Sequence, residues 1–445
     1  MGVADGAEST GLVRVIGRWS LAALAINSVL GSGVFGLPAT VAGLLGGYSV
    51  VGVFIASLAM GIIMACFAEV SSRFSEAGGP YLYARVSFGK LTGVLVAWLL
   101  YLAQAAAPAA NVNLFVIYLA EFWPAVLEPW PRFLMLSLLV AALTIINVAG
   151  VRQGTIANNV FTIVKLLALA SVVVAGAVMV LKQPTHIQPA ATHVPLRSWL
   201  QATVFVAFLF GGFESALAPM GEAKDPRRDA GFALFATLIG CGVIYVLIQW
   251  VVTAILGSSA STQRPLAEVA RITMGNHGAA IVAVSAMVSV YGYLGAKLLG
   301  MPRVTFSLAE QGDLPRIFCS VSRKFHTPWF SILLYAVVIW ILAGIGSFAW
   351  NVSLSVVSRL FYYGVVCVAV MVLRAREGPA KFRLPGGPLL PLLGVAVCIV
   401  LATQVDVRQS NIVCLTVLAA LLHWTWLRTF RREKEIPQRA RTGSQ

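Results

Sequence analysis

Long apolar runs dominate the chain, and polar residues fall between them. Twelve runs occur, at about 17–43, 48–72, 88–119, 132–150, 156–181, 199–222, 230–256, 278–308, 328–347, 353–374, 387–405 and 410–430. Each is close to or above the ~17–25 residues that a helix needs to cross a bilayer. The pattern therefore predicts an all-α membrane protein with twelve transmembrane helices.

Two of these runs carry glycines near their middle. Gly31 and Gly33 flank Ser32 in the first run, and Gly211 and Gly212 are adjacent in the sixth. Glycine costs about 1 kcal/mol in a helix interior relative to alanine, so both helices are expected to unwind there. Unwound backbone is tolerated at membrane depth only where protein buries it or where it lines an aqueous cavity. The alternative is a glycine-rich packing face on a continuous helix.

The two glycine clusters are five runs apart, and because five is odd, the second copy enters the membrane from the opposite face. Inverted repeats with discontinuous helices that meet near the midplane have this arrangement. The half-helices would present free N–H and carbonyl groups to one cavity, which suits a ligand with a carboxylate and an ammonium group. The expected parts are a tail at 1–16, a five-helix repeat at 17–181, an inverted repeat at 199–374, two helices at 387–430 and a tail at 431–445.

Composition and charge agree with this class. The chain of 445 residues is 59% hydrophobic and 11% charged, whereas soluble domains average about 25% charged residues. A net charge of +15 could indicate nucleic-acid binding, but most of the 32 Lys and Arg residues fall on the side that holds the N-terminus. By the positive-inside rule both termini are cytoplasmic, no nucleic-acid partner is expected, and the basic tail can contact anionic lipid.

Enzyme chemistry finds no support in the sequence. The six cysteines show no CxxC or CxxH spacing, the five histidines lie in loops or at span ends, and no Walker A sequence occurs. These residues predict neither a disulfide framework nor a metal site. We therefore expect no enzyme activity, no metal and no cofactor.

An ordered set of motifs resembles the amino-acid permeases of the amino acid, polyamine and organocation (APC) transporter superfamily. The set comprises the stretch around Gly31 to Gly33 and the runs 69–83, 208–215 leading into 221–228, 303–315 and 382–386. The resemblance implies a LeuT-like bundle of five plus five inverted helices with two more at the C-terminus. It further implies secondary transport of amino acids across the cytoplasmic membrane by alternating access.

On this reading the substrate lies between the two helix breaks. Its carboxylate would take N–H groups of the first break, and its amine would take carbonyls near Ser28, Phe208 and Gly211. The resemblance also places an aromatic lid near Phe208. The expected substrate-binding residues are Ser28, Gly31, Ser32, Gly33, Phe208, Phe210, Gly211, Gly212 and Lys297.

Ionisable residues inside predicted spans are functional candidates because hydrocarbon makes them costly. Glu214 follows the second break, and the resemblance to arginine-exchanging relatives implies a gating or acid-response role; the alternative is a structural carboxylate. Lys297 continues a stripe through Ser285, Ser289 and Tyr293. In the pocket it would disfavour cationic substrates; it could equally snorkel or neutralise Glu214. A further such residue, Arg359 in the tenth span, is expected to be a structural tie or an extracellular gate element.

Lys165 is the candidate for ion coupling. It shares one helical face with Asn158 and Thr162, and that face must point into the bundle. Lys165 is similar to the lysine that, in sodium-independent relatives, places its ammonium where sodium-coupled members hold Na⁺. It would bind carbonyls near Ile26 and Leu30, and a buried lysine can release a proton. Transport is therefore expected to be independent of Na⁺, by proton symport or exchange.

The sequence thus predicts a transporter of neutral amino acids. A cationic amino-acid or polyamine exchanger is the alternative within this class, and a channel or receptor on the same bundle is the alternative outside it.

Eukaryotic light-chain relatives join a heavy chain through a cysteine after the third span. The matching loop at 121–131 has no cysteine, so no such disulfide-linked partner is expected. The oligomeric state stays open.

Overall fold

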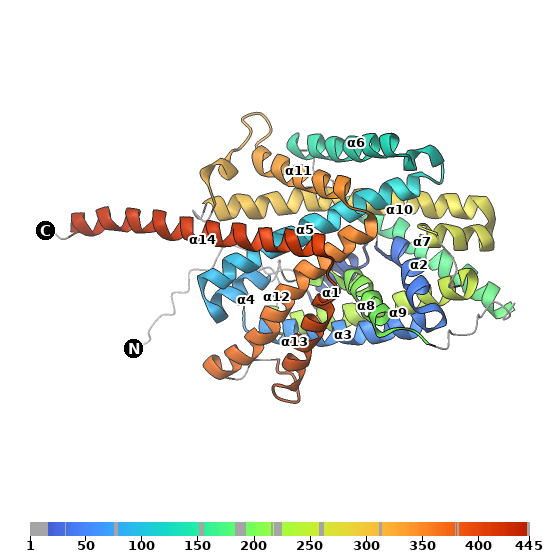
Figure 1. Ribbon diagram of the computed structural model, residues 1–445, viewed down its shortest axis with the longest axis horizontal. Helices are drawn as coiled ribbons and strands as arrows, with labels where there is room; N and C mark the ends of the chain where they lie inside the picture. The colour runs from blue at the N-terminus through green and yellow to red at the C-terminus, as the bar shows by residue number, and fades with distance from the viewer. Residues whose placement is uncertain are drawn as a thin grey trace.

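The computed structural model describes residues 17–31, 33–74, 79–150, 155–182, 193–214, 217, 225–257, 262–310, 314–378, 380 and 382–442. Within these ranges all regular structure is helical (Figure 1). The helices are α1 (Arg18–Val29), α2 (Gly33–Leu45), α3 (Ser49–Ser71), α4 (Gly79–Phe88), α5 (Lys90–Leu119), α6 (Pro129–Val148), α7 (Thr155–Lys182), α8 (Leu196–Phe210), α9 (Pro226–Leu256), α10 (Pro265–Glu310), α11 (Trp329–Ile345), α12 (Phe348–Glu377), α13 (Leu389–Ala402) and α14 (Val407–Thr442). Short 3₁₀ turns lie at Gly46–Tyr48, Pro124–Leu127 and Arg316–Cys319.

The predicted all-helical membrane class is confirmed, but in a coarser form than twelve spans. Among the described residues, 8 helical segments are long and apolar enough to cross a membrane. The sixth, ninth and eleventh predicted spans correspond to α8, α11 and α13, apolar helices of 15, 17 and 14 residues. The first predicted span is divided between α1 and α2. The twelve-span count and the LeuT-like layout therefore stay predictions.

Two further helical features depart from the hydropathy pattern. The short helix α4 lies between the second and third predicted spans, and its first residues belong to the motif at 69–83. The helix α10 is kinked at Gly275 (φ 74°, ψ −171°), which separates a short first part from the long one. The predicted span began at 278 because the residues before it are too polar to belong to an apolar run.

The helix α5 runs through the bundle and packs against α4, α10, α11, α12 and α14 (Figure 1). Its buried face between residues 103 and 110 consists mostly of alanine. Small side chains let neighbouring helices approach closely in a membrane, where packing rather than hydrophobicity holds helices together. Asn111, which follows these alanines, is therefore drawn into the interior of the bundle and is 2% exposed.

The first glycine cluster coincides with a helix end. The helix α1 ends at Val29, and the N–H of the following residue, Leu30, donates to the carbonyl of Ile26 at 2.7 Å. The helix α2 then begins at Gly33, so its first N–H groups have no partner within the helix. Ser32 lies outside the described residues.

The second glycine cluster also ends a helix, and the two ends meet. The helix α8 ends at Phe210. Gly212 has φ 112°, which side chains other than glycine rarely adopt, and a Cβ there would lie 2.7 Å from the carbonyl oxygen of Ser28. Only glycine therefore allows the backbone after α8 to cross the end of α1.

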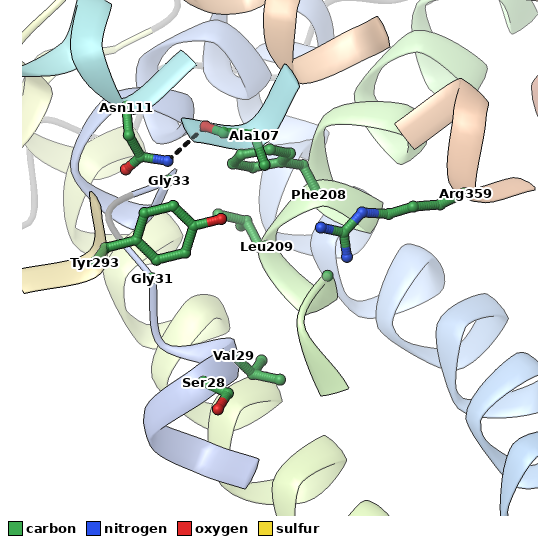
Figure 2. A pocket seen from close by; sticks show the side chains of 11 residues that line it. Ser28, Val29, Gly31, Gly33, Ala107, Asn111, Phe208, Leu209, Tyr293 and Arg359 are labelled. Carbon is green, nitrogen blue, oxygen red and sulfur yellow. Dashed lines mark hydrogen bonds between the residues drawn. The ribbon is translucent and has the colours of Figure 1, made fainter. Parts of the chain in front are cut away.

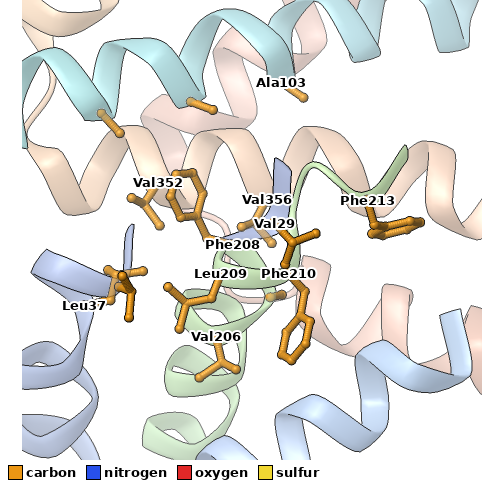
Figure 3. Packing of buried hydrophobic residues seen from close by; sticks show 14 of the residues in the cluster. Val29, Leu37, Ala103, Val206, Phe208, Leu209, Phe210, Phe213, Val352 and Val356 are labelled. Carbon is orange, nitrogen blue, oxygen red and sulfur yellow. The ribbon is translucent and has the colours of Figure 1, made fainter. Parts of the chain in front are cut away.

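The aromatic residues around the second break face different parts of the molecule. Phe208 and Phe210, two residues apart on α8, point in opposite directions (Figure 3). Phe210 is fully buried and packs edge-on against Tyr245 of α9, with ring centroids 5.3 Å apart. Phe213 packs against Phe67 of α3 at 5.0 Å. Phe210 and Phe213 thus pack against neighbouring helices of the bundle, whereas Phe208 points in the opposite direction from Phe210.

The end of α3 is tied to the connection between α12 and α13 by a buried carboxylate. Glu69 is 0% exposed and accepts two hydrogen bonds of 2.6 Å from the guanidinium of Arg374. It also accepts the backbone N–H of Leu384 at 2.8 Å. This contact joins the motifs at 69–83 and 382–386, which are far apart in the sequence.

Candidate functional site

A small cavity of about 20 Å³ lies where the two breaks meet (Figure 2). Its lining comprises Ser28, Val29, Gly31, Gly33, Ala107, Asn111, Phe208, Leu209, Gly211, Tyr293 and Arg359. A water needs about 10–15 Å³ of such space, so this volume corresponds to little more than one water. The helices must therefore move apart before the site can hold a molecule of amino-acid size.

The structure brings most of the predicted binding residues together at this cavity. Ser28, Gly31, Gly33, Phe208 and Gly211 line it. The lining draws on both breaks, so backbone from the ends of α1 and α8 and from the start of α2 borders one space. The role of these residues in substrate binding stays a prediction.

Three predicted binding residues lie off the cavity wall. Gly212 is at the crossing with Ser28, where its role is to permit close approach. Phe210 points away toward Tyr245. Lys297 lies one helical turn beyond Tyr293, with its Nζ 5.5 Å from the centre of that ring, and it donates to the side-chain oxygen of Gln104 at 2.7 Å.

Arg359 and Glu214 form a buried ion pair beside the cavity. Nη1 of Arg359 lies 2.8 Å from Oε1 of Glu214, and both side chains are 3% exposed. Glu214 also accepts hydrogen bonds from the hydroxyl of Tyr362 at 3.0 Å, from that of Tyr363 at 3.3 Å and from the backbone N–H of Gly212 at 3.0 Å. All these contacts are made within the protein. This arrangement is the one expected if Glu214 is a structural carboxylate, the alternative to a gating role.

The guanidinium of Arg359 itself reaches the cavity wall. It lies so close to Gly211 that a Cβ at that position would overlap it. Among the described residues at or beside the cavity, three cations, Arg359, Lys297 and Lys165, stand against the single carboxylate of Glu214. The surroundings of the cavity therefore carry an excess of positive charge.

Lys165 of α7 caps the end of α1. Its Nζ donates to the carbonyl of Leu30 at 2.5 Å and to the side-chain oxygen of Asn27 at 3.1 Å, and Thr162 donates to the same oxygen at 3.1 Å. Lys165 is 6% exposed. Its ammonium thus satisfies a carbonyl that the helix break leaves without an intrahelical partner.

Tyr245 of α9 satisfies carbonyls at both breaks. Its hydroxyl lies 2.9 Å from the carbonyl oxygen of Val29 and 2.8 Å from that of Leu209. The single hydroxyl proton is shared between the ends of α1 and α8. Sequence reasoning missed this residue, because a tyrosine in an apolar run is usually a packing residue and nothing local indicates its partners.

Asn111 is a second residue that sequence reasoning missed. Its amide nitrogen donates to the carbonyl of Ala107 at 2.8 Å, but its buried side-chain oxygen has no hydrogen-bond partner among the residues that the structure describes. A buried acceptor without a donor costs about 1–3 kcal/mol, and this one borders the cavity. The available signal was a polar residue at the end of an alanine run within an apolar span.

The described part of the chain contains no candidate metal site. No group of three or more His, Cys, Asp or Glu residues there could hold a metal ion.

Comparison with known proteins gives one family match over most of the chain. Residues 16–423 match the family described as amino acid permease. The chain is 28% identical over 411 residues to the methylthioribose transporter of Bacillus subtilis, covering 88% of each protein. It is 25% identical over 410 residues to the branched-chain amino acid permease BcaP of the same organism, again covering 88% of each. It is 27% identical over 412 residues to the serine/threonine exchanger SteT of B. subtilis, covering 87% of this chain and 90% of that protein.

Proposed function

Because the chain belongs to the amino acid permease family, we propose that it is a secondary active transporter that carries neutral amino acids across the cytoplasmic membrane by alternating access. The family and these relatives are transporters and not enzymes, and the apolar helices make the chain an integral membrane protein. The basic loops support an orientation with both termini in the cytoplasm.

The observation that carries the proposal is the meeting of two helix breaks at one cavity. The N-terminus of α2, which begins at Gly33, offers free N–H groups and a positive dipole end to the substrate carboxylate. The ends of α1 and α8, near Ser28 and Phe208, offer carbonyl oxygens to the ammonium group. A zwitterion spanning the breaks would satisfy both kinds of backbone group.

The polar side chains at the cavity support a neutral side chain on the substrate. The excess positive charge of Arg359 and Lys297 over Glu214 opposes a cationic substrate, which counts against the cationic amino-acid or polyamine exchanger. The unpartnered oxygen of Asn111 would accept a hydrogen bond from a substrate hydroxyl, amide or ammonium. Because one relative is named a methylthioribose transporter, that compound belongs in the substrate screen too.

Lys165 supports transport that does not depend on Na⁺. Its ammonium already contacts the carbonyl of Leu30 and the side-chain oxygen of Asn27 at the end of α1. A sodium ion at the same carbonyl would have to compete with this buried cation. Proton symport and obligatory exchange are both compatible with a lysine that can lose its proton.

Purified protein in liposomes tests the proposal. A thermal-shift screen against the proteinogenic amino acids, common amines and methylthioribose should find stabilisation by neutral amino acids, because a ligand that binds only the folded state stabilises it. Counterflow of the same compounds should be saturable. A channel would show flux without trans-stimulation, and a receptor would show binding without flux.

The role of Lys165 has a matched control on the same helix. Lys165→Ala should strongly impair counterflow, and Lys165→Arg should not restore it, because guanidinium is larger and does not titrate. Lys182→Ala, at the exposed end of α7, should behave as wild type. Wild-type uptake that disappears when Na⁺ is replaced by choline at constant pH contradicts the sodium-independent assignment.

A further inference from the structure

A second and much larger cavity lies beside the first. Its volume is about 340 Å³, within the range of about 300–1,000 Å³ for small-molecule sites. The lining comprises Gly36, Thr40, Asn113, Val116, Ile117, Leu127, Arg132, Thr262, Gln263, Ser347, Phe348 and Ala349. We call it the outer cavity, because α5 ends, α6 and α10 begin and α11 joins α12 around it, on the face opposite the proposed cytoplasmic termini.

The two cavities follow the same two helices. Gly33 of α2 lines the inner one and Gly36, three residues on, lines the outer one; Asn111 and Asn113 of α5 are divided in the same way. At 1.5 Å per residue, each step is less than about one helical turn. The outer cavity therefore lies on a direct path from the outer face to the inner cavity.

Two aromatic rings separate the cavities along α2. Phe208 lines the inner cavity, and its ring carbons lie 3.0 Å from where a Cβ of Gly33 would be. Phe348 lines the outer cavity, and its ring comes within 2.6 Å of the Cβ position of Gly36. Movement of these rings would connect the two spaces.

The outer cavity has a single charged residue in its described lining, and that residue is not neutralised. Nη2 of Arg132 donates to the side-chain oxygen of Asn113 at 2.7 Å and to the carbonyl of Gly346 at 3.4 Å. Its Nε and Nη1 have no partner, and no carboxylate lies within ion-pair distance of it, among the residues that the structure describes. Glu121, an acidic residue of the same face, is already held by Arg264 and Arg271.

We propose that the outer cavity is a second binding site for the same zwitterionic amino acid, in which Arg132 holds the carboxylate before the substrate enters the inner cavity. This inference rests on the proposed function. A guanidinium with free nitrogens is well suited to a carboxylate, because charge-assisted hydrogen bonds are about twice as strong as neutral ones. The side-chain oxygens of Thr40 and Gln263 are available to the ammonium group, and Val116, Ile117 and Leu127 provide an apolar wall for a neutral side chain.

Chemical protection of Arg132 tests the site on the wild-type protein. Phenylglyoxal, which modifies arginine, is applied to full-length protein in liposomes, and modification of each arginine is quantified by peptide mass spectrometry. L-Leucine and L-serine should slow modification of Arg132 several-fold, whereas isoamylamine, which lacks the carboxylate, should not. Arg408, an exposed arginine at the start of α14 on the same face, is the internal control and should react at one rate throughout.

Two outcomes of the protection experiment overturn the proposal. Equal protection by sodium chloride at the same concentration means that Arg132 binds inorganic anions in general. No protection by any neutral amino acid that the protein transports means that the outer cavity is no substrate site.

Transport kinetics give an independent readout. Arg132→Gln should raise the KM for uptake from the outer face roughly tenfold, the loss expected for one charge-assisted hydrogen bond, with little change in the maximal rate. Arg132→Lys should restore much of the affinity, and Arg408→Gln should match wild type. If Arg132→Gln instead lowers thermal stability and the maximal rate at an unchanged KM, the residue only ties Asn113 to Gly346.

The two proposals fail separately. If the wild-type protein shows counterflow and the Arg132→Gln variant has the same KM as wild type, the outer site is refuted and the transport function stands. Protection of Arg132 by L-leucine without counterflow of any amino acid refutes the transport function and leaves an amino-acid site at the outer cavity.

Discussion

Replacing Gly33 with alanine should weaken substrate binding by roughly 5- to 150-fold, the factor that corresponds to about 1–3 kcal/mol. A Cβ at Gly33 would lie 3.0 Å from two ring carbons of Phe208 and 3.1 Å from Leu209, closer than ordinary contacts. The ring must shift by a few tenths of an ångström, beside a cavity of only about 20 Å³. Overpacking of this kind typically costs about 1–3 kcal/mol, and binding bears this cost because a bound substrate would fill the space into which the ring shifts.

The same change at Gly31 is the matched control. Gly31 lines the same cavity, but the nearest atom to its Cβ position is the carbonyl oxygen of Val29 at 3.8 Å. Gly31→Ala should therefore leave affinity within about twofold, as substitutions without steric conflict usually do. The two variants differ from wild type by one methyl group each, so composition and hydropathy are equal between them.

Equilibrium binding of a radiolabelled substrate from the thermal-shift screen provides the measurement. Gel filtration and thermal unfolding without ligand confirm that both variants insert and fold. If Gly31→Ala loses as much affinity as Gly33→Ala, the contact with Phe208 does not determine the shape of the site, and the steric reasoning is refuted.

Three further changes probe the contacts around the breaks. Gly212→Ala should prevent recovery of folded protein, because the backbone has φ 112° and the Cβ would lie 2.7 Å from the carbonyl oxygen of Ser28; a normal melting curve would contradict this crossing. Glu69→Gln should lower the free energy of unfolding by about 3–5 kcal/mol, the usual cost of breaking a buried ion pair, here with Arg374, and a thermal shift near zero would show that the pair contributes little. Tyr245→Phe should destabilise the protein by about 1–3 kcal/mol, because it removes the side-chain donor to the buried carbonyl of Leu209 and leaves the carbonyl of Val29 with only the N–H of Gly31; unchanged stability would mean that another donor reaches Leu209.

The helix interruptions could be predicted from sequence because their cause is local. Paired glycines weaken a helix wherever they occur, and both clusters coincide with helix ends, at Val29 and at Phe210. The requirement for glycine at position 212 does not come from the local sequence. It depends on the carbonyl of Ser28, which belongs to another helix, so no window of sequence contains it.

The wall of the cavity was harder to predict for the same reason. Lys297 continued a four-residue stripe, but each such step turns about 40° around the helix and advances about 6 Å. Tyr293 therefore lines the cavity, while Lys297 is carried past it to Gln104. Arg359 was recognised as costly in a membrane, but its partner Glu214 is 145 residues away and becomes visible only in the fold.

The pattern of satisfied and unsatisfied groups at the breaks separates structural roles from binding roles. Lys165 and Tyr245 occupy carbonyls at the ends of α1 and α8, and Glu214 occupies the N–H of Gly212. These side chains keep the helix ends stable in a dry environment, where an unpaired backbone group costs several kcal/mol. The first N–H groups of α2, from Gly33, and the side-chain oxygen of Asn111 are left over. The donors and the acceptor left at the cavity are complementary to a carboxylate and to an N–H or O–H donor, so the proposed substrate would complete a set of hydrogen bonds that these groups leave open.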